Sequence, residues 1–281
     1  MMNAMNLIKR SGIAALAVAA LASCNSGEEK KAAAADSAKA AAAAPGAIGT
    51  PIKYDSSKRY IFLTWDDSPQ PPGTTICKGI FHEAGVKATF FSVGFNQVGP
   101  LKKRIIDSLR SAYPEFLLAN HSFSHGFRNQ YGKFYSPAMR DSALNDFLKN
   151  EALLKVPVKI IRLPGNNTWA ANGQIQGQKA SNLLVKALDS LGYKIIGWDL
   201  EWHERGKYPQ ESVTEMIQKL NQKFDDGNTM EQNAIVILSH DRLFEKPQYA
   251  DSLRRFISVL KQDPRNVFET IDHYPMVQGR K

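Results

Sequence analysis

The stretch His121-Ser122-Phe123-Ser124-His125 follows one apolar run, and Thr64-Trp65-Asp66-Asp67 ends another. Two histidines four positions apart in a helix or tight turn can aim both imidazoles at one point. Two neutral imidazoles and one carboxylate, with positions left for water and substrate, are usual ligands of a hydrolytic metal site. Asp66 and Asp67 can supply that carboxylate and a second one. Because adjacent side chains on a strand point different ways, we expect one to bind the metal and the other to accept a proton from water.

Short apolar runs alternate with longer amphipathic segments from residue 52 to the end of the chain. The runs that predict strands are residues 59–64, 88–93, 116–120, 158–163, 194–198, 234–239 and 266–270. The segments that predict helices are residues 74–84, 100–112, 137–154, 179–191, 209–224 and 247–261. Gly85, Gly192 and Gly227 lie just beyond three of these helices, where a left-handed residue is common. This alternation predicts an α/β fold with a parallel sheet, either open or closed as a barrel.

Polar side chains gather at the carboxyl ends of the predicted strands. They lie at residues 64–67, 120–125, 162–166, 198–201 and 239–241. In a β/α barrel these strand ends form one rim, where active sites are built from loops that follow different strands. The positions therefore favour a barrel with a single site at that rim.

Arg162 and His240 are candidate catalytic groups on this rim. An arginine can pair with a carboxylate through two hydrogen bonds and lower the pKa of that carboxylate, and Asp66 is the partner that we expect for Arg162. His240 would face the metal site from the opposite side and could protonate a leaving group, with Asp241 bound to its other nitrogen. A purely structural arginine that ties down a loop is the alternative for Arg162. The remaining histidines have no such context and are interpreted as surface or loop residues: His82, His203 and His273.

The segment Trp198-Asp199-Leu200-Glu201-Trp202 suits a wall that binds sugars. Aromatic faces pack against the C–H faces of pyranose rings while acids bind the hydroxyl groups. Trp169 is a further candidate for this wall. The alternative is that Trp198 lies in the core and that Trp202 is merely half-exposed.

The amino-terminal residues predict an exported protein. Lys9 and Arg10 precede a short apolar stretch that ends Leu21-Ala22-Ser23-Cys24. This order is typical of an export signal, and its end resembles the lipobox of bacterial lipoproteins, with an ordinary secretory signal as the alternative. We therefore expect a signal peptide over residues 1–23, lipidation of Cys24, a flexible tether rich in Ala, Lys and Glu over residues 24–50, and a catalytic domain over residues 51–281. The predicted location is the cell envelope, with the lipid of Cys24 in a membrane.

Composition narrows the partners further. If Cys24 carries lipid, Cys77 is left alone and no disulfide can form within the mature chain. The formal net charge is +9 and falls to +7 without Lys9 and Arg10, which favours anionic polymers or lipid head groups. The sequence has no phosphate-binding glycine loop and no basic cluster interleaved with aromatic residues, so no nucleic-acid partner is predicted. No protein partner is evident.

Five motifs in order resemble those of the NodB-type polysaccharide deacetylases, carbohydrate esterase family four. They are Thr-Trp-Asp-Asp-Ser-Pro from Thr64, His-Ser-Phe-Ser-His from His121, Arg-Leu-Pro from Arg162, the Trp and acid segment from Trp198, and Leu-Ser-His from Leu238. The resemblance covers residues 60–240 and implies a distorted (β/α) barrel with about seven parallel strands.

The resemblance also implies a role for each matching residue. Asp67, His121 and His125 would bind a divalent metal, most simply Zn²⁺ and otherwise Co²⁺ or Ni²⁺. Asp66 would be the general base for the attacking water, Arg162 its orienting partner, and His240 the general acid. The remaining matching positions would contact substrate, with Leu238 against the acetyl methyl group and the backbone N–H that follows Pro164 at the oxyanion.

Two departures from the family pattern stand out. Gly165 and Asn166 follow Pro164, where the family commonly has an aromatic residue and then glycine, so the rim is reshaped. The Trp and acid segment lacks an Asp-Trp ending, which leaves open whether Asp199, Glu201 or Glu204 supports Arg162.

The resemblance predicts a metal-dependent hydrolase that removes acetyl groups from a carbohydrate, chiefly the N-acetyl group of N-acetylglucosamine in a polymer or oligosaccharide. An O-acetyl esterase that acts on xylan or a similar glycan is the second hypothesis. A glycan-binding lipoprotein without catalytic activity is the third.

Overall fold

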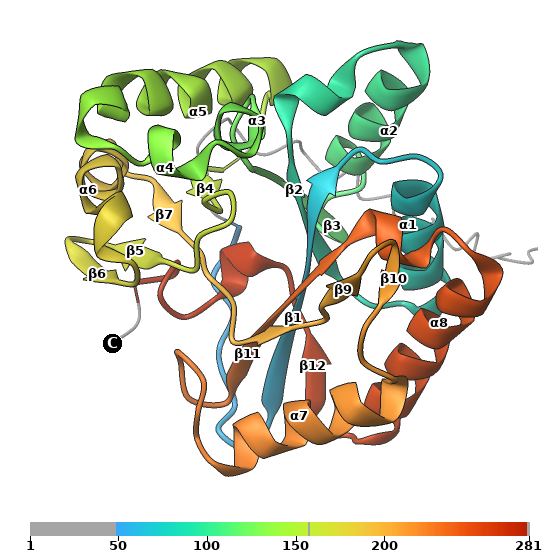
Figure 1. Cartoon of the computed structure of the whole chain (residues 1–281). Coiled ribbons are helices and arrows are strands. Elements are labelled where there is room, and N and C mark those ends of the chain that lie inside the picture. Colours follow the sequence, from blue (N-terminus) through green and yellow to red (C-terminus); the bar gives the residue numbers. More distant parts are fainter. Residues whose placement is uncertain (1–48, 157, 280–281) are drawn as a thin grey trace, which may run out of the picture. The chain divides into compact units, whose positions relative to one another are not determined.

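A curled, mostly parallel sheet forms the centre of the folded unit (Figure 1). The computed structural model describes residues 49–156 and 158–279. Seven parallel strands follow one another in space: β7 (Lys194–Ile195), β4 (Ile160–Ile161), β3 (Phe116–Asn120), β2 (Ala88–Ser92), β1 (Arg59–Ser68), β11 (Ala234–His240) and β8 (Leu200–Glu201). In addition, β12 (Asn266–Phe268) pairs in parallel with the beginning of β1. The prediction of a distorted barrel with about seven parallel strands is confirmed.

The central strand β1 is buried on both faces, and residues 60–63 in its first half are accordingly all apolar. Its side chains alternate between two cores. Ile61, Leu63 and Trp65 pack outward against the helices, whereas Tyr60 and Phe62 face the interior of the curl. The period of two therefore divides one apolar run between two clusters.

Helices cover the outer face of the sheet at the predicted places. They are α1 (Gly73–Ala84), α2 (Pro100–Arg110), α5 (Arg140–Leu154), α6 (Asn182–Ser190), α7 (Val213–Asp225) and α8 (Pro247–Gln262). Pro100 and Pro247 occupy the first turns of α2 and α8, where a missing N–H costs no hydrogen bond. Ser212 and Glu215 form a capping box at the start of α7. Gly85 ends α1 with a φ of 63°, as its position in the sequence indicates.

The sequence analysis missed the short antiparallel elements. β5 (Trp169–Ala171) and β6 (Gln174–Gln176) form a hairpin beside β7, and β9 (Glu204–Arg205) and β10 (Tyr208–Pro209) form another. The predicted strand 194–198 ends early, at Ile195. The reason is that the carbonyls of Ile196 and Gly197 accept hydrogen bonds from the Arg162 side chain.

Two buried amides fix the loop that carries the histidine pair. The Asn150 side chain of α5 donates to the Ser92 carbonyl at 2.8 Å and to Asn120 Oδ1 at 2.7 Å. Asn120 Oδ1 also accepts from the Ser122 N–H at 2.9 Å. Because both amides are fully buried, these hydrogen bonds hold the loop after β3 in one conformation.

Trp202 lies in the core, so its assignment to a sugar-binding wall is wrong. It is fully buried, packs against Phe244 and Phe256, and donates from Nε1 to the Glu211 carbonyl at 2.8 Å. Trp169 is also buried and stacks on Tyr274. The apolar surface of each indole is thus covered by protein rather than by ligand.

The predicted signal peptide, Cys24 and nearly all of the predicted tether lie outside the described residues. Among the helices of residues 49–156 and 158–279, none is both long enough and apolar enough to span a bilayer.

We expect Trp202→Ala to lower the free energy of unfolding by about 3–5 kcal/mol, because it leaves a cavity in a closed core. Trp198 is only partly buried, so Trp198→Ala should cost clearly less. Equilibrium urea denaturation of both variants checks the difference. Equal losses would show that the two indoles occupy similar environments.

Candidate active site

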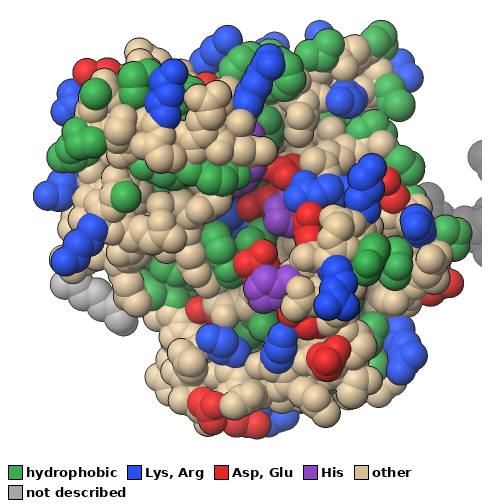
Figure 2. Space-filling model, viewed as in Figure 1, with side chains coloured by type: hydrophobic (Ala, Val, Ile, Leu, Met, Phe, Trp, Pro, Cys, Tyr) green, Lys and Arg blue, Asp and Glu red, His purple; other side chains and the backbone are tan. Residues whose placement is uncertain are grey.

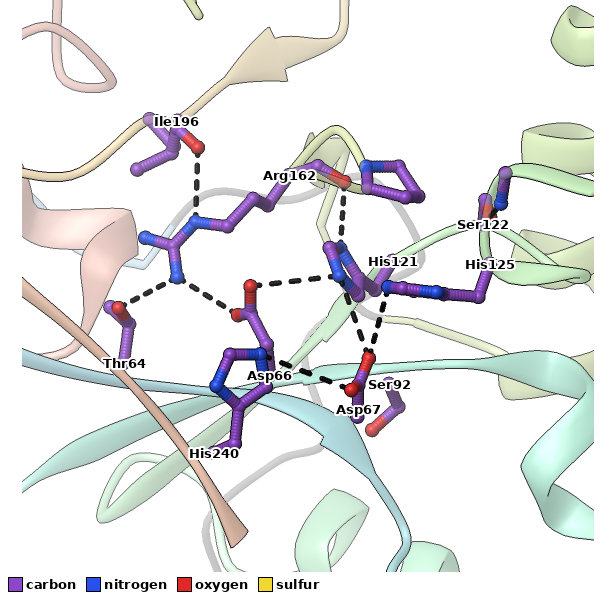
Figure 3. A network of polar contacts seen from close by, with 12 residues as sticks. Thr64, Asp66, Asp67, Ser92, His121, Ser122, His125, Arg162, Ile196 and His240 are labelled. Atoms are coloured by element: carbon purple, nitrogen blue, oxygen red, sulfur yellow. Dashed lines mark hydrogen bonds and ion pairs between the residues drawn. The ribbon is translucent and has the colours of Figure 1, made fainter. Parts of the chain in front are cut away.

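A bulge at the end of β1 places Asp66 and Asp67 in one site (Figure 3). The pairing of β1 with β2 shifts register between Asp66 and Ser68, and Asp67 has a φ of 69°. In a regular strand the two carboxylates would face opposite sides of the sheet. The bulge turns them together, so that His121 Nε2 lies 3.6 Å from Asp66 Oδ2 and 3.8 Å from Asp67 Oδ1. The expectation that they point different ways is therefore wrong.

Both histidines present Nε2 toward Asp67. His121 follows β3, and its Nδ1 lies 2.9 Å from the Arg162 carbonyl, to which it donates. His125 begins the short helical turn α3 (His125–Asn129), and its Nδ1 donates to Asn129 Oδ1. Since each Nδ1 carries the proton, each Nε2 keeps a lone pair for a ligand bond.

These three residues suit a divalent cation. Their potential ligand atoms lie within 4.8 Å of one another, and His125 Nε2 is 3.2 Å from Asp67 Oδ1. Asp67 Oδ1 is buried and has no hydrogen-bond partner within the described part of the chain, as expected of a metal ligand. The set of two imidazoles and one carboxylate is typical of zinc sites that keep an open position.

The electrostatics of the site favour the ligand protonation states. Burial lowers the pKa of His121 to about 4, although Asp66 and Asp67 oppose the shift, so the imidazole is neutral at pH 7. Burial by itself would raise the pKa of Asp67, but His125, His240, His121 and Arg242 together lower it well below its usual range. A neutral imidazole and an ionised carboxylate are the forms that bind metals.

Arg162 binds Asp66, as the sequence predicts. The guanidinium is fully buried and donates to Asp66 Oδ1 at 2.9 Å and to Thr64 Oγ1 at 2.8 Å. Its remaining hydrogen bonds go to the carbonyls of Ile196 and Gly197. Neither Asp199, Glu201 nor Glu204 donates or accepts a hydrogen bond with Arg162 in the described residues, so backbone oxygens take the place of the supporting acid.

Asp199 lies outside the cleft, and its assignment to substrate binding is wrong. Its two carboxylate oxygens accept from the N–H groups of Met230 and Val236, each at 2.7 Å. Asp199, which directly precedes β8, therefore holds β11 and the loop before it.

His240 lies on the far side of the two aspartates from the histidine pair (Figure 3). Its Nε2 is 3.9 Å from Asp67 Oδ2, and its Nδ1 is 3.2 Å from Glu204 Oε1. Asp241 does not contact His240 Nδ1, contrary to expectation. The Asp241 carboxylate instead accepts from the hydroxyls of Ser68 and Thr74.

Arg242 is a site residue that the sequence analysis missed. It donates to Asp67 Oδ2 at 2.6 Å and pairs with Glu204 at 2.5 Å. Arg242 thus binds Oδ2 of Asp67 and leaves Oδ1 of the same carboxylate for a cation. Its position two residues after His240 is the feature of the sequence that could have identified it as a site residue.

These groups open into a cleft of about 660 Å³, where acidic and histidine side chains gather in a hollow with basic side chains along its right side (Figure 2). Gly165, Trp198 and Leu238 line this cleft as predicted. Pro164 does not line it, and its carbonyl accepts from the Tyr135 hydroxyl at 2.6 Å. The Gly165 N–H forms no hydrogen bond among the described residues and is free to bind an oxyanion.

The other three histidines do not line the cleft. His82 pairs with Glu115 near the surface. His203 pairs with Glu211 and lies 3.8 Å from Glu201, a residue that lines the cleft. His273 is buried beside Glu269, at the end of the short helix Ile271–His273, which corrects its interpretation as a surface or loop residue.

Comparison with known proteins agrees with this site. The family model described as polysaccharide deacetylase matches residues 53–195, a range that contains the ligand set, Asp66 and Arg162. A search of curated protein sequences finds no match.

Three solved structures illustrate the fold similarity. A CE4 esterase of Streptococcus mutans is 25% identical with a TM-score of 0.56, covering 76% of this chain and 86% of its own. The peptidoglycan N-acetylglucosamine deacetylase Bc1960 is 22% identical with a TM-score of 0.53, covering 84% and 92%. A mutant of BA3943, a CE4 family pseudoenzyme, is 18% identical with a TM-score of 0.54, covering 83% and 72%. The fold therefore occurs in proteins with and without catalytic activity. The function of this chain has to be inferred from the residues of its site.

We expect Asn129→Ala to weaken zinc binding by roughly 10- to 100-fold, because His125 loses the acceptor that orients its ring. Competition with a chromogenic chelator measures the affinity. Asn172→Ala, at another exposed left-handed asparagine away from the cleft, serves as the control. Unchanged affinity in Asn129→Ala would show that the hydrogen bond does not orient the ligand.

The metal-free protein should lose stability as the pH falls from about 6.5 to 4. In this range the unfolded chain binds a proton at His121, whereas the folded chain does not, so the free energy of unfolding decreases. In His121→Gln this contribution is absent. Urea denaturation at several pH values should therefore show the gap between wild type and variant narrowing toward pH 4. A constant gap would contradict a lowered pKa at His121.

Proposed function

The chain belongs to the polysaccharide deacetylase family, and from this membership we propose that it is a metal-dependent hydrolase that removes N-acetyl groups from a glycan containing N-acetylglucosamine. One observation carries the proposal. Asp67, His121 and His125 converge on one point, and Asp66 and His240 both lie beside this ligand set (Figure 3). Hydrolysis of an amide needs a base for the water and an acid for the departing amine, and these are the two groups so placed.

Asp67, His121 and His125 would hold the cation, and Zn²⁺ is the metal that best fits two nitrogens and one oxygen. When bound, a divalent metal supplies Lewis acidity that polarises the acetyl carbonyl and acidifies water.

Asp66 accepts the proton of the attacking water in this proposal. The buried Arg162 holds Asp66 Oδ1, so Oδ2 remains toward the ligand set, 3.6 Å from His121 Nε2. The ion pair fixes the carboxylate rotamer and favours its ionised form before the reaction. Asp66 therefore serves as a base with one oriented oxygen.

His240 gives a proton to the amine nitrogen as the C–N bond breaks. Glu204 lies beside its other nitrogen and would stabilise the protonated imidazole. The Gly165 N–H would donate to the oxyanion, and Leu238 would contact the acetyl methyl group. Trp198, which lines the cleft beside Arg162, would pack against the sugar face.

The proposed location is the cell envelope, with the protein anchored through lipid on Cys24. The charge-then-apolar order of the first residues and the lipobox-like Leu21-Ala22-Ser23-Cys24 support it. Metabolic labelling with a fatty acid, compared between wild type and Cys24→Ala, tests this part separately.

We expect purified protein to release acetate from chito-oligosaccharides after zinc, cobalt or nickel is restored to chelated enzyme. Asp66→Asn should lower kcat at least about 100-fold, because it removes the base, while zinc affinity stays within a few-fold. Asp67→Ala should abolish both zinc binding and activity. Full activity in Asp67→Ala would refute the mechanism.

The same experiment separates amide from ester hydrolysis. An alkoxide leaving group needs less help from an acid than an amine does, so His240→Ala should lose more activity on chito-oligosaccharides than on acetylated xylan. Acetate release from the ester alone would indicate an O-acetyl esterase. Binding of acetylated glycans with no turnover would indicate a glycan-binding protein.

A further inference from the structure

The turn that begins at His125 has a strained backbone that places two side chains in the cleft. His125, Phe127, Arg128 and Asn129, together with Gly126, all have φ between 54° and 66°. Left-handed conformation is unfavourable for residues that carry a side chain. The Ser124 hydroxyl accepts from the Phe127 N–H, and its carbonyl accepts from the Arg128 N–H. The result is that His125 and Arg128 both line the cleft from one short turn.

Arg128 is the cleft arginine without a carboxylate partner. Two arginines line the cleft, and Arg242 is neutralised by Asp67 and Glu204. Within the residues that the structure describes, the Arg128 guanidinium forms no ion pair. It stacks over the Phe95 ring, with 4.5 Å from Cζ to the ring centroid. A stacked guanidinium keeps its N–H edges in its own plane, and these edges are free here to bind a planar anion.

Charge is distributed unevenly across the cleft. Arg128 belongs to the loop after β3, whereas Glu201 lies on β8, and three strands separate β3 from β8 in the sheet. Both side chains line the cleft. An anionic group would therefore be attracted at the Arg128 wall and repelled at the Glu201 wall, which fixes the direction of an extended ligand.

We propose that Arg128, supported by Phe95, binds the carboxylate of an acidic sugar next to the N-acetylated sugar, so that the substrate is an acidic glycan. This inference rests on the proposed function for the position of the acetylated sugar. A carboxylate matches a single guanidinium edge through two parallel hydrogen bonds. A phosphate group carries more charge and commonly draws several cations, and Arg128 is the single unpaired arginine of this cleft. Asn96 and Gln178 also line the cleft, where Asn96 Oδ1 and Gln178 Nε2, which form no hydrogen bond among the described residues, can bind sugar hydroxyls.

Binding is measured by calorimetry in Asp66→Asn loaded with zinc, in which we expect turnover to be at least about 100-fold slower. The ligands are an N-acetylglucosamine tetrasaccharide, a tetrasaccharide that alternates N-acetylglucosamine with glucuronic acid, and the methyl ester of the latter. We expect the acidic ligand to bind about tenfold more tightly than its methyl ester, and Arg128→Gln to remove this preference. Arg128→Lys should restore it only in part. Arg255→Gln, at an exposed arginine on α8, removes the same charge outside the cleft and should retain the preference.

Initial rates with the unmodified active site provide a second measurement. Arg128→Gln should lower kcat/KM about tenfold on the acidic tetrasaccharide and by less than about twofold on the neutral one. Equal affinity for the acid and its ester, or equal losses on both substrates, would overturn the proposal. If neither ligand is deacetylated by the wild type but the acidic one still binds through Arg128, the proposed function fails while the carboxylate site stands.

Discussion

The buried hydrogen bonds of Arg162 hold the active site together. Its guanidinium fixes Asp66, while its carbonyl accepts from His121 Nδ1, so one residue orients both the proposed base and a proposed metal ligand. The same side chain binds the free carbonyls between β7 and β8, the strands at which the parallel ladder is interrupted. Burial of this cation lowers its pKa, and Asp66 opposes the shift. The geometry of the site and the contact with the segment between β7 and β8 therefore both depend on the Arg162 side chain.

Strand positions and most site residues could be predicted from the sequence because parallel strands bring their carboxyl ends to one rim. Asp67, His121, His125, Arg162 and His240 were found in this way. Trp202 and Asp199 were wrongly assigned to the site, because an aromatic or acidic residue near that rim can also face the core or bind backbone N–H groups. Which of these it does depends on packing between segments far apart in sequence, such as Trp202 against Phe256.

The remaining misses come from backbone conformations that no short pattern specifies. The left-handed turn places Asn129 beside His125 and directs Arg128 into the cleft, although neither residue belongs to a recognised motif. Likewise, Glu204 lies in the short hairpin of β9 and β10, each of two residues. Only the folded chain brings it close to His240 and Arg242. Such contacts are decided by tertiary structure rather than by local propensity.

The extra residue at the end of β1 determines to which face of the sheet the following side chains of the strand point. Side chains before Asp67 alternate strictly between the two cores, and those after it resume with inverted phase relative to β2. Without the bulge, Asp66 and Asp67 would occupy successive positions of a regular strand and would face opposite sides of the sheet. Only one of the two acids would then reach the ligand histidines, so the bulge is what allows a single strand to supply both the proposed metal ligand and the proposed base.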